Sequence, residues 1–449
     1  MSNDLKNIQN IYFIGIGGIG MSALARYFKF LGKNVAGYDK TPSQITNDLS
    51  VLGIDIHFED KRNAIPQGFL NIKETLIIYT PAIPATHQEF NYFRDQGFLI
   101  KKRAEVLGII TKETYTLAVA GTHGKTTTTA ILAHLLKESG AKVTAFLGGI
   151  SENYNSNLVL EGNEVVVVEA DEFDRSFLCL YPDIAAVTSM DADHLDIYKE
   201  ANALETSFIE FSDKAKDHLL VRNGLPLSGI TFGIEDDSDY CAQQIKIENG
   251  TYVFDLKTPS QHIKDLRLSL PGQHNLLNAI TAFAMAIIYG SPTDAIAKAL
   301  FTFKGVQRRF SYQIKTDALV YVDDYAHHPT EIDALHQAIR EMHPHKKILA
   351  IFQPHLYSRT RDFAADFAKS LSQFDELLLL DIYPARELPI EGVTSLWLLE
   401  MINLNAKKIV TKNTLIEEIL KSDAQVITTI GAGDIGEEVT SIKEALIVV

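Results

Sequence analysis

The feature that most restricts the fold of this chain is an alternation, along almost its whole length, of short apolar runs with helical periodicity. Such alternation is typical of parallel α/β architecture. The runs expected to form strands are residues 11–14, 35–38, 76–79, 116–120, 165–168, 184–188, 319–322, 348–352, 377–380 and 426–430. Helices are expected at residues 21–31, 125–138 and 275–289. Because 449 residues are too many for one ordinary core, we expect roughly two to four domains.

The predicted elements group into three clusters, which we assign to domains of residues 1–110, 111–305 and 306–449. The two outer domains are expected to be Rossmann-like, and the central one to be a sheet of the P-loop ATPase type. Residues 219–270 differ in character, because short alternating segments and turn pairs such as Asn249-Gly250 indicate a β-rich insertion. The predicted fold class is therefore α/β with three domains.

The composition excludes some classes of partner. The chain has 42 basic and 57 acidic residues and a net charge of −15, whereas non-specific nucleic-acid binding needs a basic face. We expect no nucleic-acid partner and no membrane partner. The N-terminus lacks an apolar signal core and no apolar run is long enough to span a bilayer, so we expect a cytoplasmic protein. Cys179 and Cys241 form neither a zinc spacing nor a disulfide framework, which indicates ordinary thiols.

The first glycine cluster consists of Gly15, Gly17, Gly18 and Gly20, a G-x-G-x-x-G pattern between a predicted strand and a predicted helix. Glycine lets the backbone approach a diphosphate, and the helix N-terminus supplies N–H donors. Asp39 lies nineteen residues after Gly20, where an NAD enzyme places its ribose-binding acid. The pattern therefore predicts a site for a nucleotide diphosphate, either a dinucleotide or a UDP-sugar. The alternative is a turn that needs glycine only for packing.

A second loop, Gly121-Thr122-His123-Gly124-Lys125-Thr126-Thr127, follows a predicted strand and opens a predicted helix. It departs from the G-x-x-x-x-G-K-[ST] pattern at the first position, where Val119 stands. In this pattern the lysine contacts the β- and γ-phosphates, and the hydroxyl that follows it binds Mg²⁺. The loop predicts a bound nucleoside triphosphate, and its context argues against a chance Gly-Lys-Thr on a surface loop.

Acidic side chains follow two further strands of the predicted central domain. Carboxyl ends of parallel strands meet at one edge of a sheet, where a carboxylate can hold Mg²⁺ against the phosphates of ATP. These acids are Glu169, Asp171 and Glu172 after one strand, and Asp191, Asp193 and Asp196, with His194 among them, after the other. We predict functional roles for Glu169 and His194. For the remaining acids a solvated loop is the alternative.

The C-terminal cluster carries cationic and histidine side chains in three groups. Arg308 and Arg309 follow residues 305–307 at the expected joint between domains. The other two groups come directly after predicted strands and are Asp323-Asp324-Tyr325-Ala326-His327-His328 and Phe352-Gln353-Pro354-His355-Leu356-Tyr357-Ser358-Arg359. Pro329 is well placed to start a helix after the second group. Paired arginines are often only solvated surface and tandem histidines only polar loop residues, which is the alternative to a ligand site.

Eight segments of the chain resemble, in order, the motifs of the Mur ligase family. They are FIGIGGIGMSALA, AGTHGKTTTT, VVEADEFDRSFL, DADHLDIY, PGQHNLLNA, GVQRRF, VDDYAHHPTEI and FQPHLYSRT. The alanine-adding branch of the family is the most similar. The resemblance implies an ATP-dependent and Mg²⁺-dependent ligase of peptidoglycan synthesis. Such an enzyme joins the lactyl carboxylate of UDP-N-acetylmuramate to L-alanine through an acyl phosphate, giving ADP and phosphate.

The resemblance also implies a role for each matching residue. The implied catalytic residues are Lys125, Glu169, His194 and Arg309. The implied ATP site consists of Gly121, Thr122, His123, Gly124, Lys125, Thr126, Thr127, His274, Asn275, Asn278, Arg309 and Asp324. The implied UDP-sugar site consists of Gly15, Gly17, Gly18, Gly20 and Asp39, and the implied amino-acid site of Tyr325, His327, His355 and Arg359. The implied Mg²⁺ ligands are Thr126, Glu169 and His194.

Two positions depart from what relatives of the family carry. Leu356 stands where the family usually has arginine, so Arg359 is expected to anchor the alanine carboxylate. Residues 207–210 contain no lysine, so we expect none of the carbamylated lysine that some relatives carry there. The incoming amine must be uncharged to attack, and either His194 or His327 is suited to take its proton. We expect a monomer or a weak homodimer.

Three alternative functions remain at this stage. A related ligase that attaches a recycled tripeptide shares the DDxAHHP element but lacks the FQPHxYSR run. An NAD-dependent oxidoreductase would use only the first glycine cluster and Asp39. A non-catalytic nucleotide switch would need the phosphate loop alone. A further glycine-rich segment, Gly431-Ala432-Gly433-Asp434-Ile435-Gly436, resembles another phosphate loop, and we interpret it as a structural turn.

Overall fold

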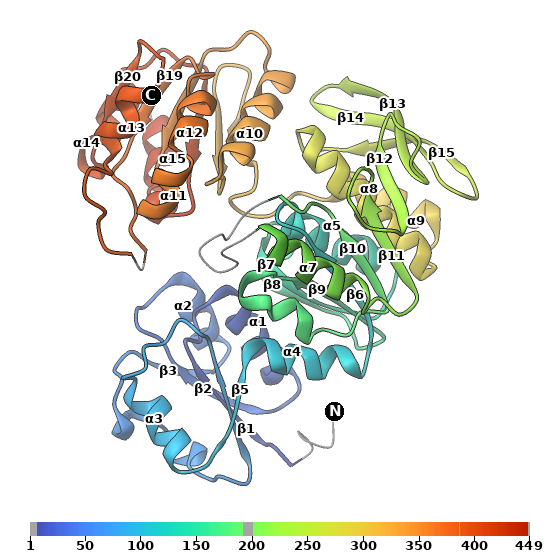
Figure 1. Cartoon of the computed structure of the whole chain (residues 1–449), viewed down its shortest axis with the longest axis vertical. Helices are drawn as coiled ribbons and strands as arrows, with labels where there is room; N and C mark the ends of the chain where they lie inside the picture. Colours follow the sequence, from blue (N-terminus) through green and yellow to red (C-terminus); the bar gives the residue numbers. More distant parts are fainter. Residues whose placement is uncertain (1–6, 192–200, 386, 448–449) are drawn as a thin grey trace. The chain divides into compact units, whose positions relative to one another are not determined.

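The computed structural model describes residues 7–191, 201–385 and 387–447 of the chain. Within this described part, the strands form three sheets of five, ten and six strands (Figure 1). Each sheet alternates with helices along the chain, so the predicted α/β class with three domains is confirmed. Short 3-10 helices lie at Arg62–Ala64, Gln67–Phe69, Phe173–Cys179 and Asp434–Glu437.

The first sheet is parallel, with strand order β3-β2-β1-β4-β5. Its strands are β1 Asn10–Ile14, β2 Asn34–Tyr38, β3 Asp55–His57, β4 Thr75–Tyr79 and β5 Leu99–Lys102, and its helices are α1 Ile19–Phe30, α2 Gln44–Val51, α3 Gln88–Asp95 and α4 Arg103–Lys112. Alternate residues of β1 face opposite ways. Ile11 and Phe13 join one buried core, and Tyr12 and Ile14 the other. This sheet is the expected Rossmann-like domain.

The second sheet has ten strands in the order β15-β14-β13-β12-β11-β10-β6-β9-β7-β8. The strands are β6 Tyr115–Ala120, β7 Val143–Ser151, β8 Ser156–Leu160, β9 Val165–Ala170, β10 Ile184–Val187, β11 His218–Arg222, β12 Ile230–Ile234, β13 Tyr240–Glu248, β14 Thr251–Lys257 and β15 His262–Leu268. The helices are α5 Lys125–Glu138, α7 Ala201–Ser212, α8 Gln273–Tyr289 and α9 Thr293–Thr302. The strand that carries the phosphate loop, β6, pairs in parallel with β9 and β10, so the ends of all three meet at one edge.

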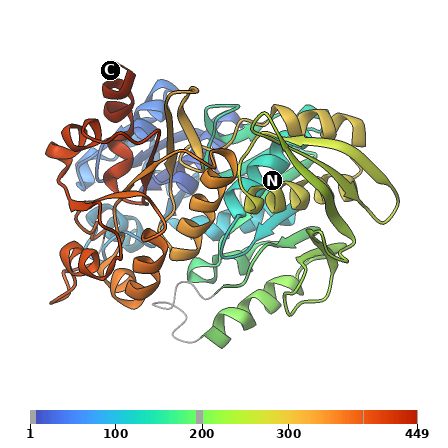
Figure 2. The same ribbon diagram turned by 90° about the horizontal axis from the view of Figure 1, so that it is seen from above.

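The stretch 219–270 is rich in strands, as expected, and these strands extend the central sheet. β11 and β12 continue the parallel pairing from β10, and β12 pairs in parallel with β13. The predicted turn between β13 and β14 is present, since Asn249 (φ 52°) and Gly250 (φ 71°) both have the positive φ of a tight hairpin turn. Figures 1 and 2 show β13, β14 and β15 in yellow-green at one edge of the sheet.

The third sheet has six strands in the order β16-β17-β21-β18-β19-β20. The strands are β16 Ser311–Lys315, β17 Val320–Asp324, β18 Ile348–Phe352, β19 Glu376–Leu379, β20 Lys407–Ile409 and β21 Val426–Ile430. The helices are α10 Pro329–Met342, α11 Tyr357–Asp362, α12 Ala364–Leu371, α13 Ser395–Met401, α14 Lys412–Leu420 and α15 Val439–Ile447. β16 is an antiparallel edge strand on an otherwise parallel sheet. Buried apolar cores cover both faces, as a parallel sheet requires.

Contacts divide the chain into two compact units. One comprises the chain up to Ile245 together with Val253–Arg267 and Leu277–Lys304, and the other comprises Lys246–Tyr252, Leu268–Leu276 and the chain from Gly305 onward. The first and second sheets fall in one unit because they share a buried core and because the Asn157 amide of β8 donates to Ile19 O (2.6 Å). The predicted boundaries 1–110, 111–305 and 306–449 remain a prediction.

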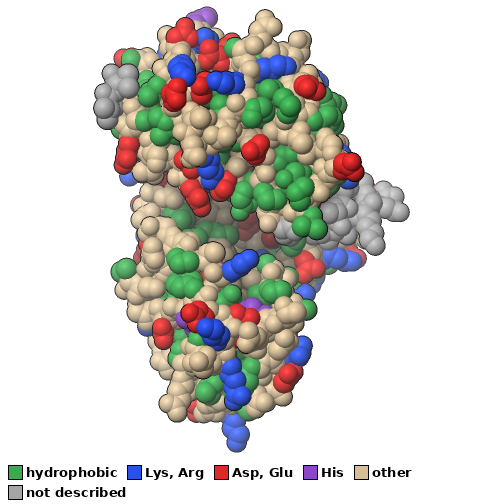
Figure 3. All heavy atoms as spheres, turned by 90° about the vertical axis from the view of Figure 1, so that its left-hand side faces the viewer, with side chains coloured by type: hydrophobic (Ala, Val, Ile, Leu, Met, Phe, Trp, Pro, Cys, Tyr) green, Lys and Arg blue, Asp and Glu red, His purple; other side chains and the backbone are tan. Residues whose placement is uncertain are grey.

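Within the described residues, no helix is both long and apolar enough to cross a bilayer. On the face drawn in Figure 3, Lys and Arg side chains lie interspersed with Asp and Glu. Cys241 is buried, Cys179 is half-buried, and both are free thiols, as their spacing predicted.

Candidate active site

The phosphate loop spans the four residues between β6 and α5 and depends on glycine at two of them. Gly121 (φ 137°) and Gly124 (φ 83°) have backbone conformations that side chains disfavour. A Cβ at Gly121 would lie 2.1 Å from Thr188 Oγ1, and one at Gly124 would lie 2.4 Å from Asn278 Oδ1. The loop therefore fits closely between the end of β10 and helix α8. This places Asn278, a predicted ATP-site residue, beside the loop.

The loop is held in shape by hydroxyl groups at the end of β10. Thr188 Oγ1 donates to His123 O (2.5 Å), and Ser189 Oγ accepts from His123 N (2.8 Å). Thr122 N donates to Ser189 O (3.3 Å), and the hydroxyls of Thr122 and Ser189 are 2.9 Å apart. Sequence reasoning predicted that this strand end would meet the loop but assigned roles only to its charged residues. Thr188 and Ser189 are thus supporting residues that it missed.

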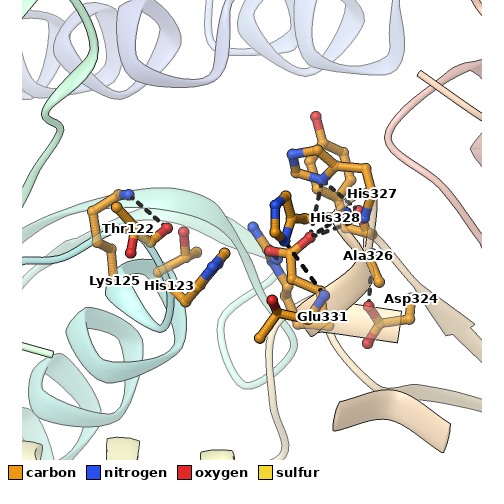
Figure 4. Close-up of polar contacts among 12 residues, drawn as sticks. Thr122, His123, Lys125, Asp324, Ala326, His327, His328 and Glu331 are labelled. Atoms are coloured by element: carbon orange, nitrogen blue, oxygen red, sulfur yellow. Dashed lines mark hydrogen bonds and ion pairs between the residues drawn. The ribbon is translucent and has the colours of Figure 1, made fainter. Parts of the chain in front are cut away.

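Lys125 lies at the start of α5, and its Nζ donates to Thr122 O (3.3 Å; Figure 4). Its Nζ donates to Gly121 O (2.7 Å) and lies 3.0 and 2.9 Å from the two carboxylate oxygens of Glu172, which is fully buried. Burial alone would lower the pKa of Lys125, but the carboxylates of Glu172, Asp171 and Glu169 raise it. The lysine is therefore held as a cation next to where the loop would receive phosphates. Glu172 is a partner that sequence reasoning did not single out.

Two of the three predicted Mg²⁺ ligands lie together. Thr126 Oγ1 donates to Glu169 Oε1 (3.0 Å), and Glu169 occupies a narrow slot in which a Cβ at Gly148 would lie 2.0 Å from its Oε2. A hydroxyl and a carboxylate are hard oxygen donors, and Mg²⁺ usually takes only one or two carboxylates and keeps several waters. These residues therefore fit Mg²⁺. The third predicted ligand, His194, lies outside the described residues, as do Asp193 and Asp196.

Three further predicted ATP residues, Thr127, His274 and Asn275, lie on α5 and α8. Thr127 is buried on α5. Asn275 is buried, and its amide donates to Pro271 O (2.7 Å), so it shapes the start of α8. His274 precedes it, and burial lowers its pKa to about 4, which keeps the ring neutral at physiological pH.

The first glycine cluster lies between β1 and α1, as predicted, but Gly20 falls inside the first turn of α1. A Cβ at Gly15 (φ 86°) would lie 2.6 Å from Thr80 Cγ2, and one at Gly20 would lie 2.9 Å from Arg103 Nη1. Gly18 precedes the helix as its N-terminal cap. Arg103, which sequence reasoning missed, is thus a cation beside the cluster.

Asp39 is bound to the glycine cluster itself. Its Oδ2 accepts from Gly17 N (2.6 Å), and its Oδ1 lies 3.4 Å from Thr41 N. The carboxylate predicted to belong to the UDP-sugar site therefore holds the glycine loop in shape.

In the C-terminal unit, Tyr325 follows β17 and lies between two cations. The guanidinium carbons of Arg308 and Arg309 lie 5.1 and 5.0 Å from the centre of its ring. Arg308 and Phe310 have positive φ (61° and 47°), so the backbone is strained on both sides of Arg309. Asp324 stabilises this turn.

The Asp324 carboxylate accepts from Phe310 N (2.7 Å) and Ala326 N (2.8 Å). Burial raises its pKa to about 6, although Arg309 and these two donors act in the opposite direction. Asp324 thus joins the Arg309 loop to the loop that begins α10, in addition to the ribose contact that the family resemblance implies for it.

Three of the residues predicted to bind the amino acid form one cluster. The His327 ring lies 5.4 Å from the Tyr325 ring and 6.1 Å from the His355 ring, both edge to face. Burial and the charge of Arg359 lower the pKa of His327, while Glu331 raises it. His355 also stacks on Tyr383 at 5.7 Å. Neither Glu331 nor Tyr383 was predicted as a site residue, since each makes its contacts through the fold.

Leu356, the departure from the family pattern, has φ 70° and directly precedes α11. Its N–H donates to Tyr383 O (2.9 Å), which fixes the backbone at this position. Arg359 follows on α11 as the cationic residue of this run whose charge reaches His327.

The segment 431–436 packs tightly against Gln353 and Arg308. Gln353 Nε2 donates to Asp434 Oδ1 (2.7 Å), and its Oε1 accepts from Ile435 N (2.9 Å). A Cβ at Gly436 would lie 2.4 Å from the Arg308 guanidinium. The glycines are needed for this packing, which agrees with a structural turn.

Family profiles match three successive parts of the chain. The Mur ligase family catalytic domain matches residues 10–115, the Mur ligase middle domain residues 119–286, and the Mur ligase glutamate ligase domain residues 308–433. The chain belongs to the Mur ligase family. The predicted resemblance is therefore confirmed.

Individual relatives are similar to this Mur ligase in sequence and structure along nearly its full length. A UDP-N-acetylmuramate–L-alanine ligase of Flavobacterium psychrophilum is 65% identical over 99% of both chains. One of Parabacteroides distasonis is 46% identical over 99% of this chain and 98% of the relative. The crystal structure of UDP-N-acetylmuramate-alanine ligase from Thermotoga maritima has a TM-score of 0.84 at 28% identity, covering 98% and 99% of the two chains.

A murein peptide ligase from Psychrobacter arcticus has a TM-score of 0.69 at 22% identity, covering 98% of each chain. This likeness shows a shared fold.

Proposed function

We propose that this chain is an ATP-dependent ligase that joins L-alanine to the lactyl carboxylate of UDP-N-acetylmuramate in peptidoglycan synthesis. The observation that carries the proposal is the full-length identity of 61 to 65% with three ligases of that name. Membership of a ligase family argues against the NAD-dependent oxidoreductase and the non-catalytic nucleotide switch. In addition, neither of these two functions would need the histidine and arginine residues found beyond residue 320.

Activation of the sugar carboxylate is assigned to the phosphate-loop half of the site. A carboxylate is a poor electrophile, so it must first attack the γ-phosphoryl group of ATP and become an acyl phosphate. Lys125 offsets the repulsion between these two anions, and Arg309 is assigned to the γ-phosphate. Thr126, Glu169 and His194 are assigned to Mg²⁺, which when bound would neutralise charge on the phosphate oxygens. The pairing of Thr126 with Glu169 supports this assignment.

The remaining ATP contacts are assigned to the loop and to α8. Gly121, Thr122, His123, Gly124 and Thr127 would surround the phosphates through the backbone of the loop and of the first turn of α5. Asn278, with His274 and Asn275 one turn earlier, would lie near adenine, and Asp324 would contact the ribose. The close fit of Asn278 against Gly124 supports the first of these assignments.

Amide formation is assigned to the C-terminal cluster. Arg359 would pair with the carboxylate of L-alanine, and Tyr325, His327 and His355 would surround its amine. The amine must lose a proton before it attacks the acyl phosphate, and a neutral His327 is able to accept one. The lowered pKa of His327 supports this choice over a permanently charged ring.

The UDP-sugar is assigned to the first domain, at Gly15, Gly17, Gly18, Gly20 and Asp39. The backbone N–H groups at the start of α1 would receive the diphosphate. The proposal also includes the domain boundaries 1–110, 111–305 and 306–449 and a cytoplasmic location. It further includes a monomer or weak homodimer that has no nucleic-acid or membrane partner.

Phosphate release tests the proposal. The protein is incubated with ATP, Mg²⁺ and UDP-N-acetylmuramate together with single amino acids or with the recycled tripeptide. We expect release with L-alanine. Release with the tripeptide alone would identify the related tripeptide ligase instead, and no release under any combination would overturn the ligase assignment.

A further inference from the structure

Glu331 is a half-buried glutamate whose carboxylate lies near His327 and Arg309, two residues assigned to the reaction. It lies in the first turn of α10, and its side chain is 17% exposed. Its Oε2 lies 3.3 Å from His327 Nδ1 (Figure 4). Its Oε1 lies 3.8 Å from Arg309 Nη1. The same carboxylate accepts from His327 N (2.9 Å) and His328 N (3.3 Å) as the capping box of α10.

These contacts determine where His327 carries its proton. His327 Nδ1 lies 3.0 Å from Tyr325 O and 3.3 Å from Glu331 Oε2. Both neighbours are acceptors without a proton to give, so Nδ1 must be the donor. In a neutral imidazole one nitrogen carries the proton and the other carries a lone pair. The lone pair of His327 therefore lies on Nε2.

Several neighbours within the described part of the chain act on the charge state of His327. Burial lowers its pKa, Arg359 and Arg309 lower it further, and Glu331 and the Tyr325 carbonyl raise it. Among the described residues, the titratable and charged groups around the ring include Glu331, Arg309, Arg359, Tyr325 and His355. The balance keeps the ring neutral near pH 7, with one carboxylate available to stabilise it once it is charged.

We propose that Glu331 is a positioning residue that holds His327 with Nδ1 protonated, so that Nε2 accepts the proton of the incoming amino acid. This inference rests on the proposed ligase function. In the step, an N–H bond of the alanine ammonium breaks, its electron pair stays on nitrogen, and the proton bonds to His327 Nε2. The free amine attacks the acyl phosphate carbonyl, and the C–O bond to phosphate breaks with its electron pair staying on the phosphate oxygen. The attacking nitrogen gives its second proton to this departing phosphate, which leaves as hydrogen phosphate as the amide forms. Glu331 stabilises the imidazolium until it releases the proton to solvent.

The role of Glu331 as a helix cap and its proposed role toward His327 have different chemical requirements. Capping needs only an acceptor oxygen, which glutamine also supplies. Positioning and stabilising an imidazolium needs the negative charge. Glu331→Gln therefore separates the two roles. The matched control is Glu105→Gln, since Glu105 holds the corresponding capping-box position of α4, where its carboxylate accepts from Lys102 N (2.5 Å) and no histidine is involved.

For Glu331→Gln we expect a melting temperature close to that of the unaltered protein and kcat/KM for L-alanine about 10- to 100-fold lower, as part of the contribution of a general base is lost. The KM for UDP-N-acetylmuramate should not change. Because the carboxylate raises the pKa of His327, its removal should move the acid limb of the kcat/KM profile to lower pH. An acid limb that does not move overturns the proposal, whatever the size of the rate loss. Glu105→Gln should leave rate and pH profile unchanged.

A second measurement observes the unaltered protein directly, without Glu331→Gln. Long-range ¹⁵N-¹H spectra of the unaltered protein report which ring nitrogen of each histidine is protonated, and the His327 signals are assigned by their loss in His327→Gln. Protonation at Nδ1 is expected, and protonation at Nε2 overturns the proposal. If the unaltered protein releases no phosphate with L-alanine, the proposed function itself fails. Normal turnover with an Nε2-protonated His327 overturns only the role of Glu331.

Discussion

Removal of Lys125 should destabilise the protein as well as inactivate it. The Lys125 side chain is 13% exposed and lies 2.9 Å from a Glu172 carboxylate that is 0% exposed. Removing one partner of a buried ion pair costs roughly 3–5 kcal/mol, because the remaining charge stays buried and loses the attraction of the partner. For a domain of this size each kcal/mol lowers the melting temperature by about 2–4 °C. Lys125→Met should therefore lower it by roughly 6–20 °C.

The cause is tested by also removing the charge of Glu172. Lys125→Met/Glu172→Gln should recover most of the lost melting temperature, although it stays inactive. Lys137→Met is the control on the same helix, because Lys137 pairs with Glu161 at the surface (2.7 Å) and such pairs contribute at most about 1 kcal/mol. Thermal unfolding is followed in chelator without nucleotide, so that bound ligands do not contribute. A double variant no more stable than Lys125→Met would refute the reasoning.

Other expected outcomes follow from single features of the site. Gly121→Ala should abolish ATP binding in calorimetry, because its Cβ would lie 2.1 Å from Thr188 Oγ1, whereas Gly68→Ala, with open space around it, should bind normally. Arg359→Leu should raise the KM for L-alanine at least about 100-fold and change the KM for ATP little. Hydrogen bonds to charged groups contribute about 1.5–3 kcal/mol, and more when a charge is left unpaired. Equal effects on the two KM values would contradict the assignment of Arg359. Burial raises the pKa of Glu89 from 4.5 to about 7, so the folded form binds the proton more tightly and stability is lost as pH rises between these values. Between pH 5 and pH 8 the free energy of unfolding of Glu89→Gln should therefore increasingly exceed that of the unaltered protein, by roughly 3 kcal/mol at most. A difference that stays constant with pH would contradict this.

The parts of the fold that local pattern predicts are the buried parallel strands. β9 is a run of valines and β18 has the bounds that its apolar run predicted, because both are buried and their composition shows it. The edge strands β3, β5 and β20 were not predicted, since they are short and half-exposed and carry polar side chains. Helix α1 begins before its predicted start, because Gly20 was expected in the loop but lies in the first turn.

The candidate site divides in the same way. Glycine loops, Lys125 and the histidine run are encoded by consecutive residues, so their positions after strands were predictable. Thr188 and Glu172 act on those residues through contacts made across the fold, whereas Glu331 contacts His327 four residues before it. All three lie in or beside the predicted strands and motifs, but their position in the sequence does not show which residues they contact. Supporting residues of this kind become visible only when the strands are paired in space.

The hydrogen bond from Gly17 N–H to Asp39 bears on how related sequences are classified. A glycine-rich turn followed by an acid at this spacing is the mark by which dinucleotide enzymes are sorted from genomic sequence. In this chain the acid at that spacing, Asp39, accepts a hydrogen bond from Gly17 and so holds the glycine-rich turn in shape. An asparagine at this position would keep the hydrogen bond, because its amide oxygen is also an acceptor. In a dinucleotide enzyme, replacing the acid by asparagine would instead weaken ribose recognition. Drift from aspartate to asparagine at this one position is therefore a criterion for separating sugar-nucleotide ligases from dehydrogenases whose glycine patterns are alike.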